Sequence, residues 1–366
     1  MDRVRVGIIG SGFSSNLHAE ALAGVAGAEI TAVCSSSKEH AAEFARKWKI
    51  GYSTADYREL LGRKDVDAVA VGIPNDLHRE VVVAAAEAGK HVILEKPIAH
   101  TLADARRMVE ACKQRQVKLM YAETIVFSPK YVRARQLAEE NAIGRVYMAK
   151  QSEKHSGPHS EWFYKVERSG GGAIMDMGCH GIEWARWMFG KPKPKSVVAH
   201  CQRVLHTKRT RGEDNSVVIL EFENGAIAVI ENSWARQGGM DDRMELYGTE
   251  GVILCDLLRG SSMETYSAKG YGYAVEKAGS TQGWTFTVAE EPYLYGFHHE
   301  FRHFIRCLQN NEAPQETGED GLATLEIIYA AYESAGTGRR VTWPYAPKRP
   351  DEVPVNQWLD STFAPK

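Results

Sequence analysis

The stretch Val4-Arg5-Val6-Gly7-Ile8-Ile9-Gly10-Ser11-Gly12-Phe13-Ser14-Ser15 decides the fold. Its first half, residues 4–9, is a mostly apolar run of the kind found in strands that are buried on both faces of a sheet. Glycines follow at once, and a helical pattern extends over about residues 16–24. A strand, a glycine turn and a helix in this order form the first half of a parallel βαβ unit.

The same alternation continues over the first 122 residues. Helical patterns separate four further apolar runs, which occupy residues 30–34, 68–73, 91–94 and 117–121. Apolar strands that alternate with helices indicate a parallel sheet covered on both faces. We therefore predict an α/β protein whose residues 1–122 form a Rossmann-type domain.

The pattern changes after about residue 123. The runs 217–222 and 226–232 are separated by Glu-Asn-Gly, which is a strong signal of an antiparallel hairpin. We predict a second, α+β domain over residues 123–366, with a large and mostly antiparallel sheet. The proline-rich tail from Pro344 is expected to be extended.

The composition excludes several classes of protein. The 366 residues include 45 Lys and Arg against 47 Asp and Glu, a formal net charge of −2, which argues against a nucleic-acid partner. No apolar run reaches the roughly 18 residues of a membrane span, so no membrane partner is expected. The six cysteines are scattered without a C-x-x-C pair, which favours free thiols and a cytoplasmic location. We also expect a homo-oligomer, a dimer or a tetramer, because large antiparallel sheets often support self-association.

The glycine loop reads G-x-G-x-x-S, with Ser15 where the dinucleotide fingerprint expects Gly or Ala. The first glycine permits a tight turn, and the second lets backbone N–H groups approach a pyrophosphate at a helix N-terminus. The alternative is a plain strand-to-helix turn. Because the loop opens a series of strand–helix units, we predict a dinucleotide site that includes Gly10, Gly12, Phe13 and Ser14.

The end of the second strand bears on the choice of dinucleotide. An acidic residue there would bind the adenosine ribose and repel a 2′-phosphate. The sequence has serines instead, with neither a carboxylate to exclude the phosphate nor an arginine to bind it. NAD and NADP both remain open, and the predicted contacts are Ser35, Ser36, Lys38 and His40.

A lysine follows the fourth strand, at the edge of the sheet where parallel sheets bind ligands. Together with four other motifs it resembles the glucose–fructose oxidoreductase/inositol dehydrogenase (Gfo/Idh/MocA) family, over nearly the whole chain. The motifs are Pro74-Asn75-x-x-His78, Glu95-Lys96-Pro97, Gly170-Gly171-Gly172, Asp176-x-x-x-His180 and Gly318-Glu319-Asp320-Gly321. The resemblance implies an NAD(P)-dependent enzyme and adds Pro74, Asn75, His78, Glu95 and Lys96 to the cofactor site.

A helix over residues 174–188 would place Asp176 and His180 one turn apart on one face, in line with Trp184 and Trp187. A histidine beside a carboxylate can serve as a base near neutral pH, whereas the plainer alternative is an amphipathic helix with a structural histidine. The resemblance implies that His180 takes the hydroxyl proton and that Asp176 binds and orients a sugar. It also implies that Lys96 donates a hydrogen bond to the reacting oxygen.

The substrate implied by the resemblance is a sugar or cyclic polyol with a secondary hydroxyl. Residues 155–165 could supply rings and hydrogen bonds, or they could form a packed surface loop. An anionic sugar is a further hypothesis, because basic residues such as Arg236 occur in this domain. Candidate substrate-binding residues are Glu123, His155, His159, Trp162, Tyr164, Lys165, Asp176 and Arg236.

Two other functions compete with dehydrogenation. A glycoside hydrolase or lyase of the same fold would oxidise a sugar transiently, eliminate, and reduce it again. A nucleotide-sensing protein without turnover would have no need of a base such as His180.

A zinc site at the H-E-x-x-H run 299–303 is disfavoured, since no third ligand is signalled and Phe297, Phe301 and Phe304 form an ordinary apolar stripe. We therefore predict no metal.

Overall fold

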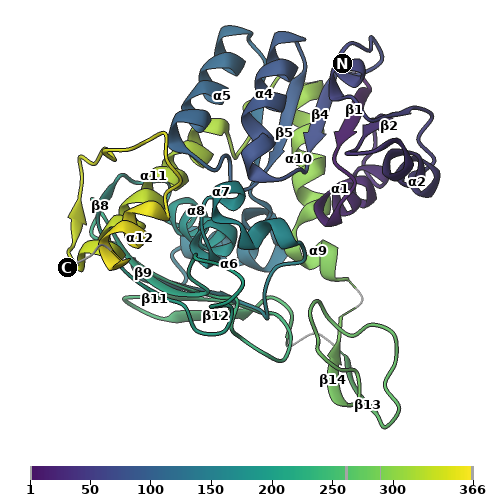
Figure 1. Ribbon diagram of the computed structural model, residues 1–366. Helices are drawn as coiled ribbons and strands as arrows, with labels where there is room; N and C mark the ends of the chain where they lie inside the picture. Colours follow the sequence, from purple (N-terminus) through teal and green to yellow (C-terminus); the bar gives the residue numbers. More distant parts are fainter. Residues whose placement is uncertain (1, 260–262, 289, 364–366) are drawn as a thin grey trace. The chain divides into compact units, whose positions relative to one another are not determined.

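The computed structural model describes residues 2–259, 263–288 and 290–363. The chain divides into two compact units. The first unit extends to Thr124 and also includes Gly296–Leu325, and the second comprises Ile125–Tyr295 and the chain from Glu326 onward. Each unit is built on its own sheet (Figure 1).

The first unit has a six-stranded sheet in the order β3-β2-β1-β4-β5-β6, and every pair in it is parallel. The strand order reverses at β1, which is the arrangement of a Rossmann fold. The predicted α/β class is thereby confirmed. The strands are β1 (Val4–Ile9), β2 (Ala28–Cys34), β3 (Ser53–Thr54), β4 (Ala68–Val71), β5 (His91–Glu95) and β6 (Leu119–Ala122).

The helices of this unit begin at side-chain caps that the sequence encodes. Ser37, Asp56 and Thr101 each accept a hydrogen bond from a backbone N–H two or three residues ahead. Helix α10 packs against α1 and belongs to this unit, although the prediction placed all of residues 123–366 in the second domain. The helices are α1 (Phe13–Ala23), α2 (Lys38–Trp48), α3 (Tyr57–Leu61), α4 (His78–Glu87), α5 (Leu102–Gln114) and α10 (Phe297–Gln309), with the short turn η1 (Asn75–Leu77). The short turn η2 (Thr124–Phe127) begins at the last residue of this part of the unit and continues into the second unit.

The second unit has a seven-stranded sheet in the order β12-β11-β7-β10-β9-β8-β15. The predicted hairpin is present as β9 and β10, but β10 pairs in parallel with β7, so the sheet is mixed rather than mostly antiparallel. Sequence periodicity cannot reveal which strand becomes the neighbour of a hairpin. The strands are β7 (Val146–Lys154), β8 (Pro194–Gln202), β9 (Asn215–Phe222), β10 (Ile227–Ser233), β11 (Asp241–Gly248), β12 (Val252–Asp256) and β15 (Val341–Thr342).

Helix α8 (Cys179–Met188) packs on β7 and β10 of this sheet. The close approach of α8 to these strands depends on Gly181, because a Cβ there would lie 2.5 Å from Ile230 Cγ2 and 2.6 Å from Gln151 Oε1. The other helices of the unit are α6 (Pro129–Glu139), α7 (Val166–Ser169), α9 (Glu291–Tyr295), α11 (Gly318–Thr337, shared between the units) and α12 (Asn356–Phe363), with the short turn η3 (Glu161–Tyr164). Helix α12 corrects the expectation of a wholly extended tail, because Val355, Trp358 and Leu359 are buried at helical spacing.

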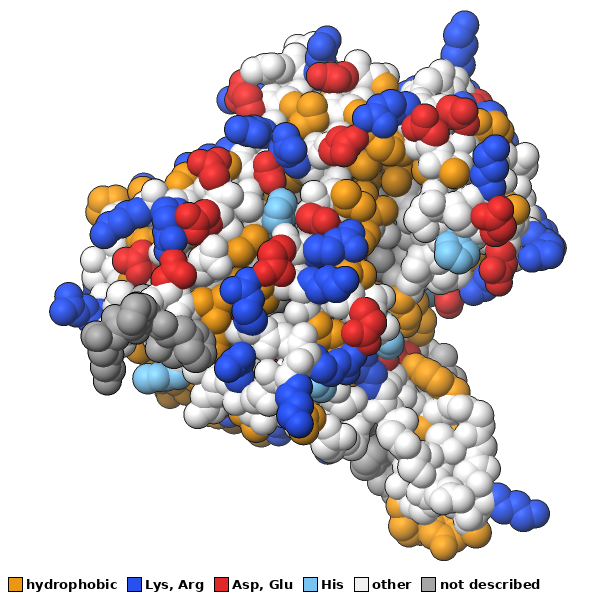
Figure 2. Space-filling view, viewed as in Figure 1, with side chains coloured by type: hydrophobic (Ala, Val, Ile, Leu, Met, Phe, Trp, Pro, Cys, Tyr) orange, Lys and Arg blue, Asp and Glu red, His pale blue; other side chains and the backbone are white. Residues whose placement is uncertain are grey.

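A separate two-stranded hairpin, β13 (Met263–Ser267) and β14 (Gly283–Thr287), also belongs to the second unit. Its rings Tyr266 and Trp284 pair at 5.4 Å and are 62% and 74% exposed. Figure 2 shows hydrophobic side chains at the far end of this hairpin, and mixed positive and negative charges over the rest of the visible surface.

No helix in the described part of the chain is long and apolar enough to cross a bilayer.

Candidate active site

The glycine loop has the geometry of a pyrophosphate cradle. Gly10 has a φ of +116°, and a Cβ there would lie only 2.1 Å from the carbonyl oxygen of Gly72. Helix α1 begins directly after Gly12, and no side chain caps its first turn. Gly12 has no atom within 4 Å of the position of a Cβ, which leaves room for a ligand. The first-turn N–H groups and the helix dipole therefore fit a phosphate anion.

The substitution Gly10→Ala should damage this loop directly. An alanine would be both in a left-handed conformation and in collision with backbone, so we expect a loss of about 1–3 kcal/mol in the free energy of unfolding and weaker NAD binding. Thermal denaturation and NAD titration measure the two effects. Gly51→Ala is the matched control, because its Cβ meets nothing within 4 Å, and it should change neither quantity.

The predicted contacts at the end of β2 lie beside this loop. The hydroxyl of Ser35 is 2.6 Å from that of Ser11, which ties the two segments together. Ser36, Lys38 and His40 are exposed. The Ser36 hydroxyl lies 3.5 Å from His40 Nδ1. The four predicted contacts carry hydroxyl or basic side chains, and the one carboxylate of residues 35–40, that of Glu39, lies in the first turn of α2.

The Pro74-Asn75-x-x-His78 motif forms the turn after β4. Pro74 precedes the short turn η1, Asn75 is buried within it, and His78 begins α4. The His78 ring nitrogens lie 3.1 and 3.0 Å from the carbonyl oxygens of Ile98 and Ile73, and burial lowers the pKa of this fully buried imidazole. His78 thus braces the loops that follow β4 and β5, and would act on a cofactor through those loops.

Lys96 lies directly after β5, with a partly exposed side chain. Its backbone N–H donates to Glu95 Oε2 at 3.1 Å. The other oxygen of Glu95 lies 2.7 Å from Nε2 of the fully buried His18. Since His18 Nδ1 has no hydrogen-bond partner among the described residues, the proton belongs on Nε2, and His18 donates to Glu95. A buried hydrogen-bonded pair therefore supports the backbone of Lys96.

The H-E-x-x-H run lies on α10 in the first unit. Glu300 is fully buried and accepts a hydrogen bond from the Thr124 hydroxyl at 3.0 Å. Burial, together with the negative charges of Glu95 and Glu123, raises the pKa of Glu300 well above its ordinary range. His303 Nε2 accepts the backbone N–H of Gln315 at 2.8 Å. These side chains hold α10 in its unit.

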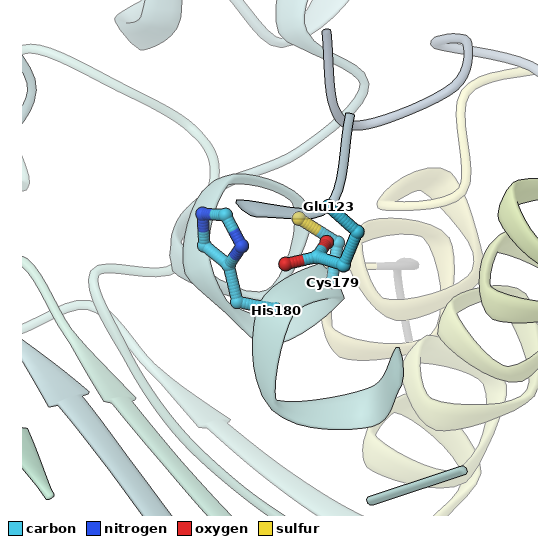
Figure 3. Close-up of side chains that lie close together, drawn as sticks. All are labelled: Glu123, Cys179 and His180. Carbon is cyan, nitrogen blue, oxygen red and sulfur yellow. The ribbon is translucent and has the colours of Figure 1, made fainter. Parts of the chain in front are cut away.

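The second unit supplies Asp176 and His180. The sequence predicts one regular helix over residues 174–188, but Ile174–Gly178 form a π turn that leads into α8. Asp176 is in the π turn. His180 follows Cys179 in the first turn of α8 (Figure 3). Glu123, also labelled in Figure 3, is a buried residue that follows β6 in the first unit. π turns interrupt helices frequently at functional sites.

Asp176 lies beside two groups that the motif does not contain, one of which bonds to it. Trp234 Nε1 donates to Asp176 Oδ2 at 2.9 Å, and His155 Nε2 lies 3.8 Å from the same oxygen. Nδ1 of His155 accepts the backbone N–H of Gly157 at 3.0 Å. The ammonium nitrogen of Lys277 is 3.1 and 3.2 Å from the two ring nitrogens of His155. A carboxyl group, an imidazole and an ammonium group thus lie within one largely buried cluster.

The other candidates in residues 155–165 differ in their surroundings. His159 is exposed and bonds Glu276 at 2.6 Å, whereas Tyr164 is buried against Trp234 with the Arg209 guanidinium 3.8 Å above its ring. Trp162 stacks on Phe163 at 3.8 Å, Lys165 is exposed, and the Arg236 guanidinium donates to the carbonyl oxygens of Gly238 and Gly239.

Trp234, Glu276 and Lys277 were missed by sequence reasoning. Glu276 and Lys277 come from the segment between β13 and β14, more than a hundred positions after the histidines that they contact. Burial alone would raise the pKa of Glu276, but the hydrogen bond from His159 and the charge of Lys277 bring it below its ordinary value. No motif or spacing marks these residues, so only the folded chain identifies them.

Trp234→Phe tests the support of Asp176. The change keeps an aromatic ring in place but removes the N–H donor, so a buried carboxylate oxygen loses the hydrogen bond from Trp234. We expect the free energy of unfolding to fall by about 1–3 kcal/mol and kcat/KM to fall with it. Trp284→Phe, on an exposed ring, should leave both unchanged. Denaturant titration and steady-state kinetics provide the comparison.

Each of the two units matches a known family of protein domains. Residues 4–123 match the oxidoreductase family with an NAD-binding Rossmann fold, and residues 131–254 match the GFO/IDH/MocA C-terminal domain. Myo-inositol 2-dehydrogenase of Thermotoga maritima is 30% identical, over 92% of this chain and 98% of that protein.

Two solved structures are similar over almost their whole length. GenD2 from gentamicin A biosynthesis, in complex with NAD, is 31% identical with a TM-score of 0.88, over 94% of this chain and 97% of that one. Levoglucosan dehydrogenase, in complex with NADH and levoglucosan, is 26% identical with a TM-score of 0.79, over 94% and 100%. The chain belongs to the GFO/IDH/MocA oxidoreductase family, and its first unit is an NAD-binding Rossmann domain.

Proposed function

We propose that the protein is an NAD(P)-dependent dehydrogenase that oxidises a secondary hydroxyl of a sugar or cyclic polyol, or reduces the corresponding ketone. The observation that carries the proposal is Asp176, fixed by Trp234 beside His155 and one turn before His180. A carboxylate held by a buried donor keeps its second oxygen in a defined position for a hydroxyl group. The relatives named above as inositol and levoglucosan dehydrogenases act on this class of compound.

Each residue has a distinct proposed task. The ammonium group of Lys96 donates to the reacting oxygen and stabilises the charge that develops on it. His180 accepts the hydroxyl proton during oxidation and returns it during reduction. Asp176 binds and orients the sugar hydroxyls. When bound, the nicotinamide supplies the hydride acceptor or donor, and the protein aligns the reacting carbon with it.

The cofactor site is proposed to comprise the glycine loop, the end of β2, the Pro74 to His78 turn and Glu95-Lys96. The hydroxyl groups of Ser35 and Ser36 can bond either a ribose or a ribose phosphate, and the basic side chain of Lys38 is close in sequence. A carboxylate that would repel NADP is absent from residues 35–38. The ratio of kcat/KM with the two nucleotides measures which one the site prefers.

A panel of cyclic polyols, free sugars and 1,6-anhydro sugars, assayed with NAD and with NADP, tests the proposal. The expected result is substrate-dependent formation of reduced nicotinamide. Turnover of a glycoside with no change in nicotinamide absorbance would instead support transient oxidation and elimination, which none of the comparisons favours. Tight NAD binding without turnover on the whole panel would contradict both reactions.

A cytoplasmic location and a homo-oligomer are part of the same proposal. The six cysteines are free thiols, four of them buried, which suits a reducing compartment. The outer positions of β9 and β10 carry Ile219 and Ile227, both exposed, which a second copy of the chain could cover. Light scattering on the purified protein measures the oligomer size.

A further inference from the structure

Two buried side chains surround the backbone that leads into the π turn. Glu213, which precedes β9, accepts the N–H of Ile174 at 2.8 Å. The hydroxyl of Tyr332, on α11, lies 2.9 and 2.8 Å from the two carboxylate oxygens of Glu213 and donates to them. The same hydroxyl accepts the N–H of Gly172 at 3.1 Å. Both side chains are fully buried, so these contacts replace water at the start of the turn.

Gly171 and Gly172 pack directly against Tyr332 and Glu213. A Cβ on Gly172 would lie 1.8 Å from the carbonyl oxygen of Glu213, and a Cβ on Gly171 would lie 2.3 Å from the Tyr332 hydroxyl. The carbonyl oxygen of Glu213 also accepts the N–H of Ala173 at 3.0 Å. Three consecutive backbone amides, those of residues 172–174, are therefore held by Glu213 and Tyr332.

Asp176 is only two residues after the last of these amides. Its carboxylate must reach Trp234 Nε1, and a shift of the Ile174 backbone would move it away. We propose that Glu213 and Tyr332 are positioning residues, which fix the π turn so that Asp176 and His180 take their working orientations. This inference rests on the proposed function of Asp176 and His180, and it assigns a task to two residues outside that motif.

The charge of Glu213 is sensitive to pH near neutrality. Burial raises its pKa to about 7, against the opposing hydrogen bonds from Ile174 and Tyr332. The titratable groups that face it are Tyr332 on α11 and Cys201 on β8, and burial raises the pKa of both well above their ordinary values. Glu213 is therefore the group of this cluster that ionises near pH 7. An ionised carboxylate is the stronger acceptor, so the turn is held more firmly above that pH.

Tyr332→Phe and Tyr329→Phe form a matched pair of variants. Tyr329 lies on the same helix and is equally buried, but its hydroxyl donates to the carbonyl oxygens of Pro350 and Glu352. Both variants lose one buried hydroxyl. Only Tyr332→Phe should lower kcat, by about tenfold or more, since small displacements of reacting groups reduce rates steeply. NAD affinity should remain that of the wild type in both.

The pH profile of kcat separates positioning from general destabilisation. In the wild type we expect a rise in kcat centred near pH 7 that reflects Glu213. Tyr332→Phe removes a hydrogen bond that lowers this pKa, so the rise should move to higher pH, and Tyr329→Phe should leave it in place. Glu213→Gln keeps an oxygen acceptor for Ile174 but cannot ionise. The part of the rise that Glu213 contributes should therefore disappear, whereas any part that comes from the base His180, and much of the activity, should remain.

Hydrogen exchange of the peptide 170–180 gives a readout that does not depend on turnover. Faster exchange in Tyr332→Phe than in Tyr329→Phe is the expected result. Equal exchange and equal kcat in the two variants, or an unchanged pH profile in Glu213→Gln, would overturn the inference. A wild-type protein that turns over no sugar or polyol would contradict the proposed function instead, and the exchange comparison would still test the positioning.

Discussion

Lys96→Met is expected to lower kcat by about 10²–10³-fold while NAD binding is retained. The methionine side chain has nearly the length of lysine but no donor, so the oxygen that gains charge during hydride transfer would lose its stabilising hydrogen bond. The backbone of Lys96 is held by Glu95, which the substitution leaves intact. The loss should therefore appear mainly in kcat. Because Lys96 is also a proposed cofactor contact, NAD titration should show a smaller loss of affinity that leaves the nucleotide bound at saturating concentrations.

Lys90→Met is the matched control for this experiment. Lys90 is in the same unit and donates to the carbonyl oxygens of Arg63 and Val66, both at 2.8 Å. Removing the ammonium group of Lys90 should reduce the thermal midpoint but leave kcat within about twofold of the wild type. Lys90 precedes β5 and Lys96 follows it, so the two side chains lie at opposite ends of that strand. If Lys96→Met behaved like Lys90→Met, Lys96 would have no part in the reaction.

His180→Ala is expected to lower kcat by about 10²–10⁴-fold, the range for removal of a positioned base. Alanine is favourable in the first turn of a helix, so α8 should remain intact. Added imidazole should restore part of the rate, because a free base can then accept the proton in place of the missing ring. The measurement is kcat as a function of imidazole concentration.

His200→Ala controls for the loss of a histidine from the second unit. His200 is exposed on β8, and its removal should change neither kcat nor the response to imidazole. A rate that falls in His180→Ala but does not respond to imidazole, accompanied by faster hydrogen exchange in α8, would show that His180 is structural and would remove the assignment of the base.

Local sequence was sufficient for several parts of the fold and the site. The apolar run of β1, the glycines at positions 10 and 12 and the helix after them depend on neighbouring residues, so their pattern predicts the Rossmann unit. The Glu-Asn-Gly turn likewise predicts the hairpin of β9 and β10. The spacing of Asp176 and His180 and the lysine after β5 identify candidate site residues, because short motifs carry their chemistry in a few consecutive positions.

Other features required contacts between distant parts of the chain. The parallel pairing of β7 with β10, the packing of α10 on α1 and the helix α12 depend on which surfaces meet, and no local pattern encodes that choice. The two-residue strand β3 is too short to show periodicity.

The sequence by itself determined the class of fold, the nucleotide loop and the identity of the motif residues. Only the tertiary structure decided how Asp176 is held. Its support comes from Trp234, 58 positions away, and the amides of its turn bond Glu213 and Tyr332, at separations of 39 and 160 positions. Buried polar groups must find partners wherever the fold brings them, and the first five residues of the predicted regular helix form a π turn among these partners.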